Sequence, residues 1–156
     1  MALSGLMAPV GAEKTAAKNS PLVAPIRDLG PALIDAVADC PLAMVEVRQL
    51  GGALGRAPQV PNAVSGRDAS FQVFCAGVGG PTEAPLMHAS IDTVLRGMKR
   101  WAIAEGTLNY LSARDTDPGS VRDAFGKDVH DRLAMVKRGY DPANLFRVNH
   151  NIPPIR

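Results

Sequence analysis

Aromatic residues are scarce in this chain, where they make up 4% of 156 residues. A hydrophobic core with so few large rings has to be built from Leu, Val, Ile, Ala and Met. The 15 glycines and 13 prolines predict frequent turns and short secondary-structure elements. The composition therefore indicates a domain with many connections, or a part of a larger assembly that supplies the missing core.

Cysteine, net charge and long apolar runs are also scarce, and each absence argues against a class of protein. Two cysteines, Cys40 and Cys75, cannot build a disulfide framework, and we expect reduced thiols in a cytoplasmic protein. A net charge of +2 with scattered basic residues argues against nucleic-acid binding. No segment reaches the roughly 18 apolar residues of a membrane span. The N-terminal residues also lack the pattern of a secretion signal.

The pattern of apolar residues predicts six elements between two irregular ends. Residues 1–20 show no apolar period and are expected to form a mobile tail. The predicted elements are, in order, a helix over residues 30–37, strands over 42–50 and 70–76, a helix over 85–104, a strand over 107–111 and a helix from 118 onward. Asp117 before Pro118 is a typical helix start, and Gly126 is expected to split this last helix into two.

The order of these elements predicts an α+β fold: a small, mostly antiparallel sheet with helices packed on one face. We divide the chain into the tail, a region over residues 21–139, and an extended C-terminal segment over residues 140–156. No strand is followed by a G-x-G-x-x-G or Walker loop, which argues against a doubly wound dinucleotide site.

Few residues offer chemistry of their own. The three histidines, His88, His130 and His150, have no cysteine or carboxylate at ligand spacing, so no metal site is predicted. The glycines of residues 51–55 favour a turn or bulge over a phosphate loop, because no helix opens after them. Glu46, on the polar face of a predicted strand, is expected to be solvated.

The C-terminal residues resemble a known family. Residues 140–147 (YDPANLFR) with 149–154 (NHNIPP) closely resemble the C-terminal signature of berberine-bridge-enzyme-like, FAD-linked oxidases. Residues 45–56 and 66–69 resemble substrate-domain strands of the same family, and residues 107–111 follow in order. The resemblance covers residues 22–156 and implies the end of a substrate domain plus the tail that folds back onto a flavin domain. The large FAD-binding domain of the family has no counterpart here.

The resemblance implies candidate site residues. Thr107 stands where the family often has a catalytic tyrosine, and a threonine hydroxyl has no accessible pKa for taking a proton. Tyr110 is the second candidate catalytic residue and is expected to face the substrate cavity. Asn109, Asn149 and His150 match positions associated with flavin contacts. Gly55 or Arg56 stands where plant members have a glutamate base, and neither residue is a base.

Two functions stay open at this point. The chain is either the substrate-side, C-terminal portion of an FAD-dependent oxidoreductase, inactive without a flavin-binding half, or a non-catalytic binding or dimerisation module derived from that family. Its expected partners are a small-molecule substrate and either a second copy or a flavin-binding half, with no nucleic acid and no membrane. A two-fold dimer would cover the sheet face that the helices leave open. We expect Tyr140, Leu145 and Phe146 to dock the C-terminal segment.

Overall fold

The computed structural model of this protein describes residues 14–22, 25–103, 106–112 and 114–155. Within these residues three strands form one antiparallel sheet in the order β1-β3-β2. The strands are β1 (Lys14–Leu22), β2 (Met44–Gln49) and β3 (Phe71–Val78). Four helices accompany them: α1 (Ile26–Val37), α2 (Ala84–Met98), α3 (Pro118–Phe125) and α4 (Lys127–Tyr140). Two short 3-10 helices are η1 (Lys99–Trp101) and η2 (Leu108–Tyr110).

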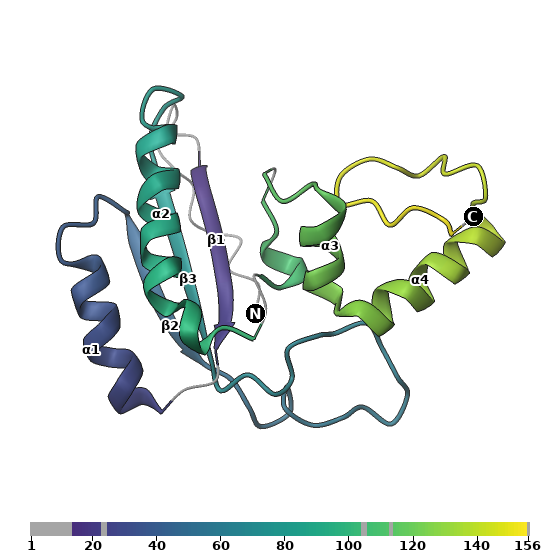
Figure 1. The fold of residues 1–156 in the computed structure, drawn as a ribbon, viewed down its shortest axis with the longest axis horizontal. Helices are drawn as coiled ribbons and strands as arrows, with labels where there is room; N and C mark the ends of the chain where they lie inside the picture. The colour runs from purple at the N-terminus through teal and green to yellow at the C-terminus, as the bar shows by residue number, and fades with distance from the viewer. Residues whose placement is uncertain (1–13, 23–24, 104–105, 113, 156) are drawn as a thin grey trace.

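One face of the sheet packs against α1 and α2; in Figure 1, α2 lies in front of the strands and α1 lies to the left of α2. Val45 lies opposite Cys75 and Val47 lies opposite Val73, and residues opposite one another share a face. The core on this side is aliphatic, as the composition predicts: its buried members are Leu22, Leu29, Val73, Cys75, Met87, Ile91, Val94 and Met98. The α+β class, with helices on one face of an antiparallel sheet, is confirmed.

The opposite face of the sheet is more polar. Glu46 lies opposite Phe74, and Arg48 lies opposite Gln72. These four residues point away from α1 and α2, because they alternate along their strands with the residues that face the helices. Instead of a long helix, the short η2 segment covers this face, where the ring of Tyr110 packs against Phe74 with centroids 5.4 Å apart. The alternation of β2 and β3 thus creates a polar surface that α1 and α2 do not cover.

The strand β1 corrects the prediction of a mobile tail. Residues 14–20 belong to this strand, which pairs with β3 from Lys14 to Leu22, while residues 1–13 lie outside the described residues. Its residues, KTAAKNSPL, show no alternation of apolar and polar types. The strand is instead stabilised by backbone pairing with the central strand, a long-range effect that overrides local propensity.

The strand predicted over residues 107–111 is also wrong. These residues form the 3-10 turn η2, in which the Tyr110 backbone N–H donates to the Thr107 carbonyl at 2.9 Å. Both edges of β3 are already paired, with β1 and β2, so this short apolar segment has no place beside the central strand. It lies across the polar sheet face instead.

The C-terminal helices follow the sequence pattern closely. The Asp117 side chain accepts a hydrogen bond from the Ser120 N–H at 2.9 Å, which caps α3 where Asp117-Pro118 predicted a helix start. Gly126 has φ +77° and separates α3 from α4, so the predicted split is confirmed. In Figure 1 these helices and the C-terminal segment extend to one side of the sheet.

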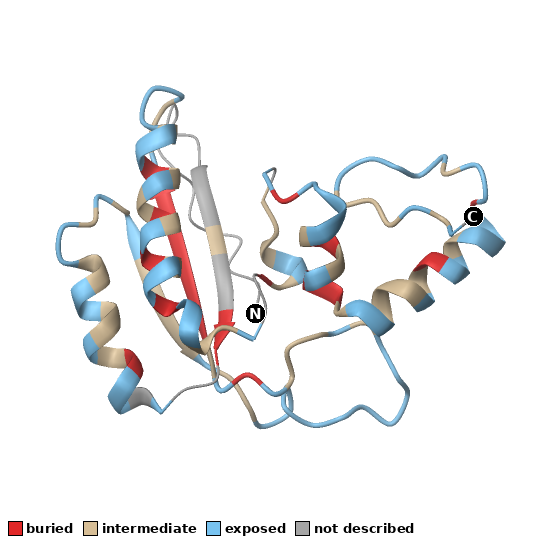
Figure 2. Cartoon of the chain, in the orientation of Figure 1, coloured by how far each residue is buried: buried red, intermediate tan, exposed pale blue. Residues whose placement is uncertain are grey.

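Among the described residues, the apolar side chains expected to dock the C-terminal segment do not do so. Tyr140 is 90% exposed and Phe146 is 82% exposed, and Leu145 is exposed as well, as the pale colour of this region in Figure 2 shows. The Asp141 carboxylate holds the turn instead, accepting from the backbone N–H groups of Leu145 (2.7 Å) and Phe146 (3.1 Å). Backbone hydrogen bonds to one buried carboxylate therefore order a segment whose large side chains remain outside.

Candidate functional site

A pocket of about 270 Å³ lies at the polar sheet face, between η2 and the long connection from β2 to β3. The sheet contributes Arg48 and Gln72, and η2 with its preceding residue contributes residues 107–110. The connection contributes Leu50, Leu54 and residues 63–67. The pocket therefore joins segments far apart in the sequence.

Arg48 is the centre of the polar network in this pocket. Its guanidinium donates to Glu46 through Nε to Oε1 (3.1 Å) and through Nη2 to Oε1 and Oε2 (both 2.9 Å). Its remaining nitrogen, Nη1, donates to the Tyr110 hydroxyl oxygen at 2.8 Å. The hydrogen bonds to Glu46 and then to Tyr110 raise the pKa of Arg48, so it stays charged throughout the physiological range.

The η2 segment is held in place from two sides. The Tyr110 ring packs at an interplanar angle of 58° on Phe74 of β3. The Gln72 side chain donates through Nε2 to Thr107 Oγ1 at 3.2 Å. Because Phe74 and Gln72 alternate with core-facing residues of β3, the same strand that builds the helix-side core also fixes η2.

Arg67 holds the opposite wall of the pocket together. It donates to the carbonyl oxygens of Leu54 (2.8 Å) and Arg56 (3.2 Å) and to Asn62 Oδ1 (3.1 Å). The neighbouring Gly66 has φ +68°, a conformation that glycine adopts without strain. The connection between β2 and β3 is exposed over much of its length, and the hydrogen bonds from the Arg67 side chain hold its parts together.

The glycines of residues 51–55 form a turn, as predicted. The backbone N–H of Leu54 donates to the Gly51 carbonyl at 3.0 Å, and both Gly51 and Gly52 have positive φ. The turn leads into the pocket wall, and no helix begins after it. Of the two residues aligned with the family's glutamate base, neither Gly55 nor Arg56 lines the pocket.

The structure brings together some of the sequence-predicted site residues. Thr107, Asn109 and Tyr110 line the pocket side by side. Asn149 and His150 do not: Asn149 is exposed with φ +69°, and a His150 ring nitrogen lies 3.0 Å from the Ser112 carbonyl oxygen. His150 thereby contacts the end of the η2 region, two residues beyond Tyr110, but its flavin role and that of Asn149 stay predictions.

Sequence reasoning missed Arg48 and misjudged Glu46. Glu46 is not simply solvated, because Arg48 engages both of its carboxylate oxygens. The signal was present in part, since residues i and i+2 of a strand share a face and opposite charges there attract. The contact of Arg48 with Tyr110 had no local signal, because 62 positions separate the two residues.

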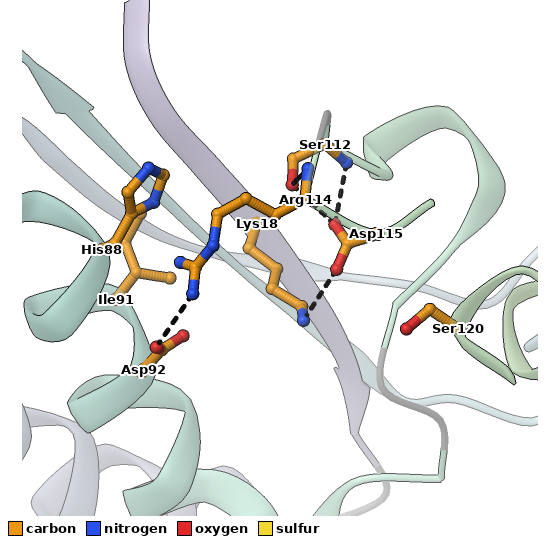
Figure 3. A pocket seen from close by; sticks show the side chains of 8 residues that line it. All are labelled: Lys18, His88, Ile91, Asp92, Ser112, Arg114, Asp115 and Ser120. Carbon is orange, nitrogen blue, oxygen red and sulfur yellow. Dashed lines mark hydrogen bonds and ion pairs between the residues drawn. The ribbon is translucent and has the colours of Figure 1, made fainter. Parts of the chain in front are cut away.

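A second, polar hollow of about 200 Å³ lies between β1, α2 and the segment before α3 (Figure 3). Lys18 pairs with Asp115 at 3.0 Å, and Arg114 pairs with Asp92 at 3.7 Å. Burial alone would raise the pKa of Asp115, but hydrogen bonds from Ser112 and the charge of Lys18 outweigh it and hold the pKa below its usual value. Lys18 and Arg114 thus each have a carboxylate partner. The ion pair between Lys18 and Asp115 links β1 to the segment before α3.

No group of three or more His, Cys, Asp or Glu side chains among the described residues is arranged to hold a metal ion. No helix in the described part of the chain is long and apolar enough to cross a membrane.

Comparison with known proteins points to one family. Residues 109–153 match the family described as "Berberine and berberine like". Over 75 residues, 48% of this chain, the sequence is 35% identical to (R)-6-hydroxynicotine oxidase of Paenarthrobacter nicotinovorans, and the match spans 16% of that relative's length.

The fold has a solved counterpart. The crystal structure of 6-hydroxy-D-nicotine oxidase from Arthrobacter nicotinovorans superimposes with a TM-score of 0.65 and 22% sequence identity. The match covers 93% of this chain and 33% of that one, so the present residues correspond to about a third of the solved protein. The family segment begins at Asn109, inside the pocket, and ends after His150. Residues 109–153 are thus similar to the berberine and berberine-like family, and the chain as a whole shares its fold with part of 6-hydroxy-D-nicotine oxidase.

Proposed function

We propose that this chain forms the substrate side of an FAD-dependent oxidoreductase and acts on a small molecule together with a flavin-binding part. The observation that carries the proposal is the pocket at the polar sheet face, into which η2 and the residue before it bring Thr107, Asn109 and Tyr110. The family match begins at Asn109, so it includes the two pocket residues Asn109 and Tyr110. A volume of about 270 Å³ lies near the lower end of small-molecule pockets, which begin at roughly 300 Å³.

The pocket fits one side of a flavin ring and not a complete FAD. It is too small for a dinucleotide, and the glycine turn at residues 51–55 opens no helix that could bind the pyrophosphate. The exposed Asn109 is the residue that would contact the ring, and the neighbouring Tyr110 would face the substrate. When bound, the flavin supplies the redox chemistry by accepting two electrons from the substrate.

The residues of this chain are suited to binding and orientation. Arg48 stays protonated because its hydrogen bonds raise its pKa, so it can donate hydrogen bonds but cannot take a proton. Thr107 has no accessible pKa, and both oxygens of Glu46 are engaged by Arg48. We therefore assign to this chain the shape and polarity of the substrate pocket, while proton transfer falls to groups outside these residues.

The C-terminal segment supports the need for a partner. Tyr140, Phe146 and Val148 are each more than 80% exposed, and clustered apolar exposure of this kind marks interaction surfaces. We propose a flavin-binding half as this partner. The two cysteines are free, which suits a cytoplasmic protein.

The alternative is a non-catalytic dimerisation module, in which the same exposed side chains cover one another across a two-fold axis. Light scattering at high micromolar concentration separates the cases. A monomer argues against the dimer, and a dimer dissociated by Phe146→Ser supports it. Met135→Ser, on exposed α4 surface outside this segment, is the matched control.

The flavin proposal is tested by fluorescence. We expect the purified chain at micromolar concentration to quench riboflavin saturably, because the ring alone is the part that this pocket can cover. Asn109→Ala should weaken the quenching, and Gln49→Ala, an amide at the exposed end of β2 outside the pocket, should leave it unchanged. Fluorescence that is indifferent to the chain would contradict the proposal.

A further inference from the structure

The pocket at the polar sheet face has an unbalanced charge. Its charged lining residues are Arg48 and Arg67, and no Asp or Glu of the described residues lines it. Arg48 is neutralised by Glu46, whereas the hydrogen-bond partners of Arg67 among the described residues are uncharged oxygens: two backbone carbonyls and the Asn62 amide. One positive charge in the pocket wall is therefore left without a counter-ion among the described side chains.

Tyr110 adds a directed hydrogen-bond donor. Its hydroxyl oxygen accepts from Arg48 at 2.8 Å, and no described residue accepts the hydroxyl hydrogen. The phenol is fixed twice, by Arg48 at its oxygen and by Phe74 at its ring. Arg48 is in turn fixed by three hydrogen bonds to Glu46. A donor held in this way is prepared to recognise an oxygen acceptor on a ligand.

The rest of the lining is largely apolar. Leu50, Leu54, Val64 and Leu108 surround the arginines and the phenol. Such walls accommodate a ring or short hydrocarbon, while the few polar groups set its orientation.

We propose that this pocket selects small apolar molecules that carry an anionic oxygen group, with Tyr110 donating to that oxygen, Arg67 balancing its charge, and Arg48 and Glu46 acting as positioning residues for Tyr110. The inference rests on the proposed function, since it names the substrate class of the same pocket. Cationic amines of the same size should be disfavoured, because the pocket wall offers them a positive charge and no free carboxylate.

Binding of three matched probes to the full chain tests the selection. Benzoate, benzyl alcohol and benzylamine share one ring and differ in charge. We expect benzoate to bind at least about tenfold more tightly than benzylamine, with the alcohol between them, as judged by titration of amide NMR signals. Equal or tighter binding of benzylamine would overturn the proposal.

Three variants assign the recognition to side chains. Tyr110→Phe keeps the ring on Phe74 and removes the donor, so benzoate binding should weaken about tenfold. Arg67→Met should weaken it as well, and Arg138→Met, an exposed arginine on α4 outside the pocket, should not. Unchanged benzoate affinity in Tyr110→Phe would overturn the role of the phenol, even if Arg67→Met disturbed its loop.

The positioning role of Arg48 has its own readout. The chain has two tyrosines, so [13Cζ]-tyrosine labelling gives one signal from Tyr110 and one from the exposed Tyr140. We expect Arg48→Met to shift the Tyr110 signal alone and to abolish its response to benzoate, and Arg48→Lys to restore part of that response. A Tyr110 signal that is indifferent to Arg48→Met would refute the positioning role. Because these titrations contain no flavin, they still test benzoate recognition if riboflavin fails to bind.

Discussion

Replacing Asp115 by Asn tests the link between β1 and the C-terminal part of the chain. Asp115 is 4% exposed, and its carboxylate pairs with Lys18 of β1 at 3.0 Å (Figure 3). It also accepts from the Ser112 backbone N–H at 2.8 Å and from the Ser112 hydroxyl at 2.7 Å. The substitution keeps the size of the side chain but removes the charge that balances Lys18.

The size of the effect follows from the burial of the two partners. A hydrogen bond to a charged group contributes about 1.5–3 kcal/mol, whereas an exposed ion pair contributes no more than about 1 kcal/mol. Lys18 is 27% exposed at its side chain, which places the pair between these cases. We therefore expect Asp115→Asn to lower the free energy of unfolding by about 2 kcal/mol.

Urea unfolding measures this loss, and Asp39→Asn, an exposed carboxylate after α1, is the matched control. A cycle with Lys18→Met should give a coupling of about 1 kcal/mol or more. The pKa of Asp115 is lower in the folded protein than in the unfolded chain, where it is about 3.9. The contribution of Asp115 to the free energy of unfolding is therefore complete above that unfolded value and is lost as the pH falls through the folded pKa. Zero coupling, or an acid dependence equal in wild type and variant, would refute this reasoning.

Two further predictions concern the core. A methyl group at Gly77 would lie 2.8 Å from three side-chain atoms of Met87, so Gly77→Ala should lower the free energy of unfolding in urea by about 1–3 kcal/mol. The control is Gly139→Ala on α4, where a methyl group meets nothing within 4 Å, and it should raise the free energy of unfolding by up to about 1 kcal/mol. Burial, with a smaller effect of Cys40, raises the pKa of Cys75 to about 12, so native protein should be alkylated at Cys40 well before Cys75. If Cys75 in the native protein were alkylated as fast as in urea-unfolded protein, its burial would be contradicted.

Periodic and capped segments of this fold could be predicted from the sequence because their signals are local. The stripe of Met87, Ile91, Val94 and Met98 forms the buried face of α2, and the Asp117 cap starts α3. The strand β1 could not be predicted, because its pairing with β3 joins residues 49 to 64 positions apart and its own residues show no alternation.

The site was predictable only where a family motif named its residues. Thr107, Asn109 and Tyr110 were identified through the resemblance, and they do line one pocket. Arg48 and Arg67 were not, because Arg48 contacts Tyr110 across the fold and Arg67 contacts residues of its own irregular connection between β2 and β3. A tertiary arrangement of this kind leaves no trace in spacing along the chain.

The most direct test of the proposed flavin-facing pocket is to map where a flavin ring touches this chain. Amide NMR signals of the full chain are recorded during a titration with riboflavin. We expect the largest shifts at residues 107–110 and at Gly66 and Arg67, which line the pocket. Shifts confined to α4 and the C-terminal segment, or no shifts at riboflavin saturation, would contradict the assignment of this pocket as the substrate side of a flavin enzyme.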